Sequence, residues 1–238
     1  MKKDDNLIYG RNPVKEAIFS GQVTKLYISQ SMKDHSLAEL AISKKISPIF
    51  LNQNELDALF PHVNQGVVAV VKRYEYQSLD NLFSHIKNVD HPIVVILDGI
   101  NDPQNFGAIL RSCDIFHVSG VIIPKHHQVP LNATVAKTSA GAINYIPVVL
   151  VSNLNNAIRS LKEKGFWVVS TDGAGTANYN EISYDFPTAL VIGSEGDGIS
   201  QLVLKNSDYI VKIPLLGHLN SLNASVAAGI LLARIRNK

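Results

Sequence analysis

The sequence predicts an α/β protein with a small N-terminal unit and a larger C-terminal unit built on a parallel sheet. Strand-like apolar runs alternate with helix-like segments along the whole chain. The run at 93–97 is apolar at every position, as expected for a strand covered on both faces. The pattern weakens into polar residues from 73 onward, which is typical of a connector. We therefore expect domains at 1–73 and 92–238, joined by a linker at 74–91.

The N-terminal unit reads as a short alternation of strands and helices. Asn12 is suited to cap a helix and Pro13 to occupy its first position, so the first helix is expected to begin at Pro13. A short amphipathic stretch lies within the linker, at 79–86. The expected strands are 7–9, 25–29, 48–51 and 67–71, and the expected helices are 13–20, 36–44 and 54–60.

A stronger alternation fills the C-terminal unit. Strands that alternate with helices indicate a parallel sheet with helices on both faces. Ligands of such sheets bind at the carboxyl ends of the strands, so the loops after Leu97, Ile192 and Ile213 are where chemistry is expected. The expected strands are 93–97, 120–123, 146–151, 166–170, 188–192 and 209–213, and the expected helices are 105–116, 132–140, 154–164, 200–205 and 221–235.

Composition narrows the class of protein. Of 238 residues, 46% are hydrophobic and 18% are charged, and no apolar run is long enough for a membrane span. The first six residues do not resemble a secretory signal, so we expect a cytoplasmic protein without membrane contact. Cys113 is the only cysteine, which excludes an intrachain disulfide and favours a core position. His126 and His127 are adjacent rather than four apart, so no metal site is expected.

Two polar segments follow predicted strands, and each has a purely local explanation. In 98–107, Asp102 and Pro103 can form a turn and Asn105 can cap the next helix, with Arg111 on its surface. In 193–198, three glycines allow close approach of the backbone to a ligand. The spacing matches neither common phosphate-binding loop and the segment has no lysine, which disfavours a nucleotide-phosphate site.

The third segment, 213–229, passes from a strand through a loop into a helix of small residues. Locally, it indicates a helix capped by Asn220 or Ser221, with a close-packed face that includes Ala228. A formal net charge of only +2 would not by itself indicate a nucleic-acid partner.

The three segments in this order resemble the signature motifs of the SpoU, or TrmH-like, family of RNA 2′-O-ribose methyltransferases within the SPOUT superfamily. Residues 8–14 and 65–69 are similar to the substrate-binding domain of the same family. The resemblance implies a parallel sheet whose C-terminal part forms a deep trefoil knot, and a small ribosomal-protein-like α/β domain before it. It also implies S-adenosylmethionine as the methyl donor, RNA as the partner and a homodimer that completes the active site.

The resemblance also assigns roles to residues. Arg111 is given the central catalytic role; since a guanidinium is a permanent cation, we expect it to stabilise the developing alkoxide and to orient an RNA phosphate. Glu195 is expected to fix that guanidinium by paired hydrogen bonds. The expected catalytic residues are Asn105, Arg111, Glu195, Ser221 and Asn223. The expected cofactor-binding residues are Gly193, Glu195, Gly196, Ile213, Leu215, Leu222 and Asn223.

Three functions stay open at this point. The resemblance is strongest to bacterial enzymes that methylate a guanosine ribose of 23S ribosomal RNA, and the separate N-terminal domain favours ribosomal RNA. A tRNA guanosine 2′-O-methyltransferase would share every catalytic motif. A catalytically inactive RNA-binding or ribosome-assembly protein would have no need for Asn105, Arg111, Glu195 and Asn223 together, so these residues favour an enzyme.

Overall fold

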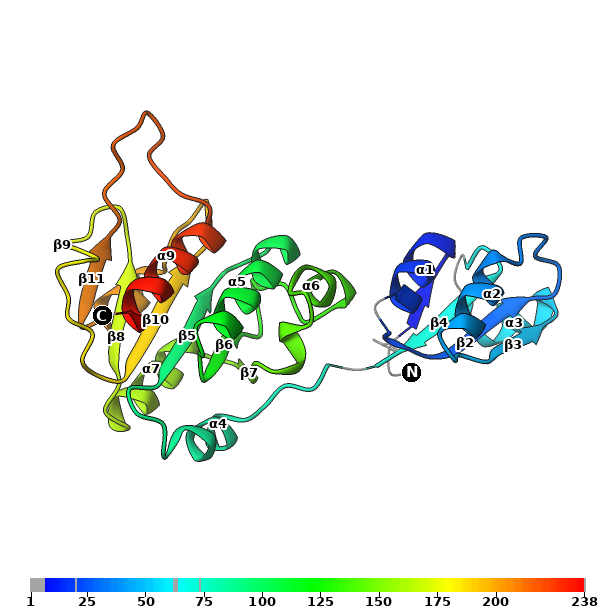
Figure 1. Ribbon diagram of the computed structural model, residues 1–238, viewed down its shortest axis with the longest axis horizontal. Helices are drawn as coiled ribbons and strands as arrows, with labels where there is room; N and C mark the ends of the chain where they lie inside the picture. The colour runs from blue at the N-terminus through cyan, green and yellow to red at the C-terminus, as the bar shows by residue number, and fades with distance from the viewer. Residues whose placement is uncertain (1–6, 20, 62–63, 73, 238) are drawn as a thin grey trace. The chain divides into compact units, whose positions relative to one another are not determined.

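The computed structural model describes residues 7–19, 21–61, 64–72 and 74–237. The chain forms two compact units, Met1–Tyr74 and Glu75–Lys238, and in each of them helices pack against a sheet (Figure 1). Three expectations fall on residues that lie outside the described ones. They are the absence of a secretory signal at residues 1–6, the end of the first helix at 20 and the first domain boundary at 73.

The first unit holds a mixed four-stranded sheet with the order β1-β4-β2-β3. β2 and β3 are parallel, whereas β4 runs antiparallel to both β1 and β2. The buried core lies between this sheet and the first two helices, where Val14, Ile18 and Ala41 pack against Leu26 and Ile28. The elements are β1 (Leu7–Tyr9), α1 (Arg11–Phe19), β2 (Val23–Ser29), α2 (Ser36–Ser43), β3 (Pro48–Leu51), α3 (Gln53–Leu59) and β4 (Val67–Val71).

The expected start of the first helix was wrong by two residues. α1 begins at Arg11, and the Val14 main-chain N–H donates to the Gly10 carbonyl oxygen at 3.1 Å. Gly10, which comes directly before the helix, has φ +89, a conformation that glycine adopts without steric cost. Pro13 is tolerated in the first turn because a main-chain N–H there would have no partner within the helix.

The second unit holds a seven-stranded sheet with the order β7-β6-β5-β10-β8-β11-β9. Every neighbouring pair is parallel, so the expected parallel sheet is confirmed and all carboxyl ends lie at one edge. The two-residue β9 was not expected. The strands are β5 (Ile93–Asp98), β6 (Gly120–Pro124), β7 (Val148–Val151), β8 (Trp167–Thr171), β9 (Ala177–Asn178), β10 (Thr188–Gly193) and β11 (Tyr209–Lys212).

Helices cover both faces of this sheet. On one face α5 packs between α6 and α9, and α9 also contacts β10. On the other face, apolar residues of α4, α7 and α8 form one cluster with the sheet. Figure 1 shows α5 and α9 side by side in front of the strands. The helices are α4 (Leu79–Ile86), α5 (Pro103–Ile115), α6 (Ala133–Thr138), α7 (Leu154–Glu163), α8 (Gln201–Lys205) and α9 (Ala224–Arg236), with a 3-10 turn at Ala142–Asn144.

Residues 75–91, expected as a linker, are packed into the second unit instead. The Gln77 main-chain N–H donates to the Val148 carbonyl oxygen at 2.8 Å, beside the edge strand β7. Leu82 and Ile86 of α4 are buried in the sheet cluster. The amphipathic face of α4 accounts for this correction, because its apolar side chains gain free energy only when they are covered.

Cys113 of α5 is fully buried, which confirms the expected core position, and burial raises the pKa of its thiol. Among the described helices, none has the length and apolarity needed to cross a bilayer.

The contact between α5 and α6 requires glycine at position 107. A Cβ added there would lie 1.7 Å from Thr138 Oγ1 and 2.9 Å from the Ser139 main-chain nitrogen. We expect Gly107→Ala to lower the free energy of unfolding by about 1–3 kcal/mol, because it overpacks this contact. Urea denaturation measures the change.

Gly229 provides the matched control for that substitution. It lies within α9, and a Cβ there would meet only Ser112 Oγ, at 3.8 Å. Gly229→Ala is expected to leave stability unchanged or to raise it by up to about 1 kcal/mol, because alanine is the better helix former. Equal destabilisation by both substitutions would contradict the packing described for α5.

Candidate functional site

A cavity of about 300 Å³ lies where three loops meet at the carboxyl ends of β8, β10 and β11. Seven residues predicted from the sequence line it: Gly193, Glu195, Gly196, Ile213, Leu215, Ser221 and Leu222. The sequence interpretation missed the loop after β8, because Thr171, Asp172 and Gly173 carry no motif. It also missed Asn220 and Ala227, which line the cavity from the third loop and from α9.

The loop 193–198 forms a tight turn. Ser194 and Gly198 exchange main-chain hydrogen bonds of 3.1 Å each, and the Asp197 N–H donates to Ser194 Oγ at 3.1 Å. A Cβ at Gly193 would lie 2.4 Å from the Gly198 carbonyl carbon, so only glycine fits there. The Ser200 N–H donates to Asp98 Oδ2 at 2.8 Å and ties this loop to the end of β5.

The lining of the cavity suits a nucleoside-like ligand. Gly173 and Gly196 have open space where a Cβ would stand, so a ligand can approach their main chain closely. Ile213, Leu215 and Leu222 add apolar surface. Main-chain donors and acceptors beside apolar side chains are the usual setting for an adenine and its ribose. The residues present therefore fit the expected cofactor.

Three side chains join the three sequence motifs into one hydrogen-bonded network. Asn105 Nδ2 donates to Glu195 Oε1 at 3.0 Å, and Asn223 Nδ2 donates to Asn105 Oδ1 at 2.8 Å. Asn223 Nδ2 also donates to Glu195 Oε1, and the Ala224 main-chain N–H approaches the same oxygen at 3.4 Å. Positions 105 and 223 are 118 residues apart in the sequence, so this network is a purely tertiary feature.

Helix caps place the two asparagines, and they differ from the caps that the sequence suggested. Asp102 caps α5, its Oδ1 accepting from the Gln104 N–H at 3.0 Å, so the Asn105 side chain is available to reach Glu195. Asn223 caps α9 in place of Asn220 or Ser221. Its Oδ1 accepts hydrogen bonds from the N–H groups of residues 225 and 226 at 3.0 and 3.3 Å, while its Nδ2 donates to Asn105 and Glu195.

Arg111 lies exposed on α5, about one and a half turns beyond Asn105. Among the described residues, no hydrogen bond or ion pair joins Arg111 to Glu195. The expected pairing is therefore not made in this structure. Glu195 Oε1 accepts from the two asparagines instead.

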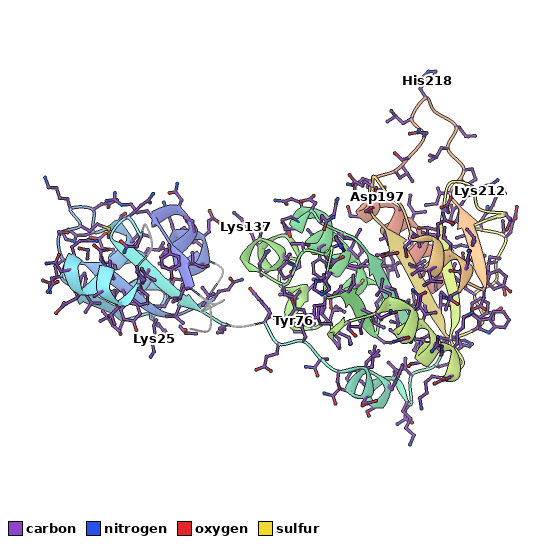
Figure 2. The ribbon with its side chains drawn as sticks, turned by 180° about the vertical axis from the view of Figure 1, so that it is seen from behind. Lys25, Tyr76, Lys137, Asp197, Lys212 and His218 are labelled. Atoms are coloured by element: carbon purple, nitrogen blue, oxygen red, sulfur yellow. The ribbon has the colours of Figure 1, made fainter. Side chains whose placement is uncertain are left out.

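The third loop projects from the unit between β11 and α9. Figure 2 shows His218 at its tip, away from the body of the unit, with Lys212 labelled at the end of β11. Leu216 is 99% exposed and Leu219 is 81% exposed.

A larger cavity, of about 550 Å³, lies beside α4 and β7 and is lined by Gln77, Asn81, His85 and Tyr145 among others. It contains no residue of the three motifs. We place the chemistry in the smaller cavity, because the polar groups of distant segments converge there. Within the described chain no group of three or more histidine, cysteine or carboxylate side chains could hold a metal ion.

Two family models match the chain, one for each unit. The model of the SpoU rRNA methylase family matches residues 92–233. The model described as RNA 2′-O ribose methyltransferase substrate binding matches residues 7–77.

Individual proteins match over nearly the full length. A TrmH family tRNA/rRNA methyltransferase of Staphylococcus saprophyticus is 43% identical over 240 residues, covering 99% of this chain and 96% of its own. The SpoU methyltransferase AviRb of Streptomyces viridochromogenes, in complex with AdoMet, is 26% identical with a TM-score of 0.67 and covers 97% of this chain and 89% of its own. An AdoMet-bound rRNA methyltransferase of Sinorhizobium meliloti is 25% identical, also with a TM-score of 0.67, and covers 97% and 86%.

The network makes a prediction about stability. Asn105 is only 9% exposed, so Asn105→Ala removes a buried amide that satisfies two partners and should lower the free energy of unfolding by about 1–3 kcal/mol. Asn144 is the control, because its Nδ2 donates to the Gly141 carbonyl oxygen on the exposed surface. Asn144→Ala should cost less than about 0.5 kcal/mol. Urea denaturation giving the same cost for both variants would contradict the network's role.

Proposed function

Because this chain belongs to the SpoU rRNA methylase family of RNA ribose methyltransferases, we propose that it methylates the 2′-hydroxyl of a guanosine in 23S ribosomal RNA. Its methyl donor is S-adenosylmethionine, which relatives of the same fold bind. The proposal places the donor in the 300 Å³ cavity and the target ribose beside the first turns of α5.

The observation that supports this arrangement most is the Asn105–Glu195–Asn223 network. It connects the glycine loop and α9, both of which line the cavity, to the helix that carries Arg111. The donor methyl and the nucleophile must meet in line, and a fixed distance between donor pocket and arginine helix provides that constraint. Fixed positioning of this kind has no use in a protein that only binds RNA.

In the proposed reaction the ribose oxygen would form a bond to the methyl carbon, the sulfur would keep the electron pair of the bond that breaks, and the hydroxyl proton would pass to solvent water. S-adenosylmethionine supplies the electrophilic methyl group when it is bound. Arg111 stabilises the alkoxide character that develops on the ribose oxygen and orients a neighbouring phosphate. Ser221 and the amide groups of Asn105 and Asn223 hold the ribose and the loops in place.

The choice of RNA rests on the N-terminal unit. Its match to a substrate-binding model supports an RNA substrate, and the rRNA methyltransferase of Sinorhizobium meliloti, which covers 97% of this chain, supports ribosomal RNA. A tRNA target is the alternative, since a SpoU/TrmH tRNA-modifying enzyme of A. aeolicus, 28% identical with a TM-score of 0.58, covers 67% of this chain. A catalytically inactive assembly protein is disfavoured, because Asn105, Glu195 and Asn223 join all three motifs beside the cavity.

Three further expectations belong to this proposal. A trefoil knot is supported by the strand order, in which β10 returns between β5 and β8 before β11 adds beyond β8 and α9 comes back to α5. A homodimer is supported by the exposed leucines of the loop 213–223. A cytoplasmic location is supported only by the nature of the RNA substrate.

Mapping of 2′-O-methyl groups tests the proposal. Total RNA from cells with and without this protein should differ at one guanosine ribose of 23S ribosomal RNA. The same site should be restored by the wild-type chain. A lost methyl group in tRNA would select the alternative substrate, and identical maps would contradict a ribose methyltransferase function.

Arg111 makes the sharpest mechanistic prediction. Arg111→Ala should lower kcat for methyl transfer at least about 100-fold, because it removes the stabilisation of the developing alkoxide, while the Kd for S-adenosylmethionine changes less than threefold. Arg159, exposed on α7, is the matched control, and Arg159→Ala should keep full activity. Transfer of labelled methyl to RNA measures both variants. Near wild-type turnover of Arg111→Ala would remove this residue from the mechanism.

A further inference from the structure

A short basic loop follows β6, directly beside the loop that leads into α5. Lys125, His126 and His127 are consecutive and all three are exposed. β6 and β5 are neighbouring parallel strands, so this loop and the loop 98–102 leave the sheet at the same edge, about 4.8 Å apart at their strand ends. Neither the methyl-donor cavity nor the three motifs include this loop.

The main chain of this loop is held in place from several sides. The Lys125 N–H donates to the Val151 carbonyl oxygen at 2.8 Å. The Ile100 N–H donates to Gln128 Oε1 at 2.8 Å, and the Val129 N–H donates back to the Ile100 carbonyl oxygen at 3.0 Å. His127 adopts φ +58, a conformation that is uncommon outside glycine. The loop is therefore fixed to the loop 98–102, so its exposed side chains start from a defined position.

The end of the loop is held as well. The Leu131 N–H donates to the hydroxyl oxygen of Tyr76 at 2.9 Å, and Figure 2 labels Tyr76 in the segment that enters the second unit. Burial raises the pKa of the Tyr76 hydroxyl, so this group stays protonated as an uncharged anchor.

The charge around the loop is one-sided. No aspartate or glutamate occurs anywhere in residues 115–162, a segment that contains Lys125 and Lys137. The nearest carboxylates on the neighbouring loop are Asp98 and Asp102, and both accept main-chain N–H groups. The segment 115–162 itself therefore presents an RNA phosphate with cationic side chains and no carboxylate.

We propose that Lys125, His126 and His127 bind the phosphate backbone of the RNA next to the nucleotide that is methylated. The cavity lies at the β8, β10 and β11 part of the sheet edge, and the loop 125–127 lies at the β5 and β6 part, beside the loop that leads to Arg111. Lysine and imidazole N–H groups are suited to phosphate oxygens and carry no base specificity. The inference rests on the proposed function and assigns the loop to substrate positioning.

The test compares full-length variants in three measurements. Lys125→Gln and the double variant His126→Gln/His127→Gln remove the proposed contacts, and Lys125→Arg preserves the charge. Lys87→Gln is the control, because it alters an exposed lysine that follows α4 and precedes the amino end of β5. The measurements are the Kd for an unmodified 23S ribosomal RNA transcript at several salt concentrations, KM and kcat for methyl transfer, and the Kd for S-adenosylmethionine.

We expect Lys125→Gln and the double variant each to raise the RNA Kd and the KM for RNA about tenfold, with kcat and the S-adenosylmethionine Kd within twofold of wild type. The slope of log Kd against log salt should become shallower by about 0.7–1 for the lost lysine contact. Lys125→Arg and Lys87→Gln should behave as wild type.

Unchanged RNA affinity and salt slope in both variants would overturn the inference. Equal loss in Lys125→Arg would overturn it too, because a structural role of the loop would then explain the defect. RNA affinity is measured without turnover, so a wild-type chain that binds the transcript but transfers no methyl would contradict the proposed function and leave this test intact.

Discussion

The hydrogen bonds among Asn105, Glu195 and Asn223 are the constraint on which the site depends. Asn105 is a buried amide, and a buried amide without partners would cost free energy, so its Nδ2 and Oδ1 require Glu195 and Asn223 at fixed positions. Those two residues lie on the glycine loop and at the start of α9. Satisfying one buried side chain therefore holds three distant segments together and shapes the cavity between them.

The loops that carry the proposed functional groups all lie at one edge of the sheet. From β6 to β11, the carboxyl ends carry the basic loop 125–127, the loop that leads to Arg111, and then the loops that line the cavity. Because all strands are parallel, these groups meet on the same side without any long-range reach. RNA backbone, target ribose and methyl donor can thus lie in sequence along a rigid support. The N-terminal unit matches a model of RNA 2′-O ribose methyltransferase substrate binding, and the residues that line the cavity all belong to the second unit.

Much of this could be predicted from the sequence, because apolar periodicity and the three motifs are local signals. The parallel sheet followed from the periodicity, and seven of the residues that line the cavity followed from the resemblance that the motifs carry. Helix caps did not, because several polar residues compete for each helix start. Asp102 caps α5, while the Asn105 side chain bonds to Glu195, 90 residues away in the sequence. The partner of Glu195 was also missed. Opposite charges favour a pairing with Arg111, but Glu195 contacts two asparagines from distant segments. The packing of α4 depends on the face of the sheet that it covers, which sequence alone does not show.

A crystal structure of the full-length protein with S-adenosylhomocysteine tests the central claim most directly. The account predicts that the ligand lies in the cavity between Gly193, Ile213 and Leu222, with its sulfur toward Asn105 and the Asn105–Glu195–Asn223 bonds intact. A ligand bound in the larger cavity beside α4 and β7, or one bound after those bonds have broken and the loops have separated, would contradict it.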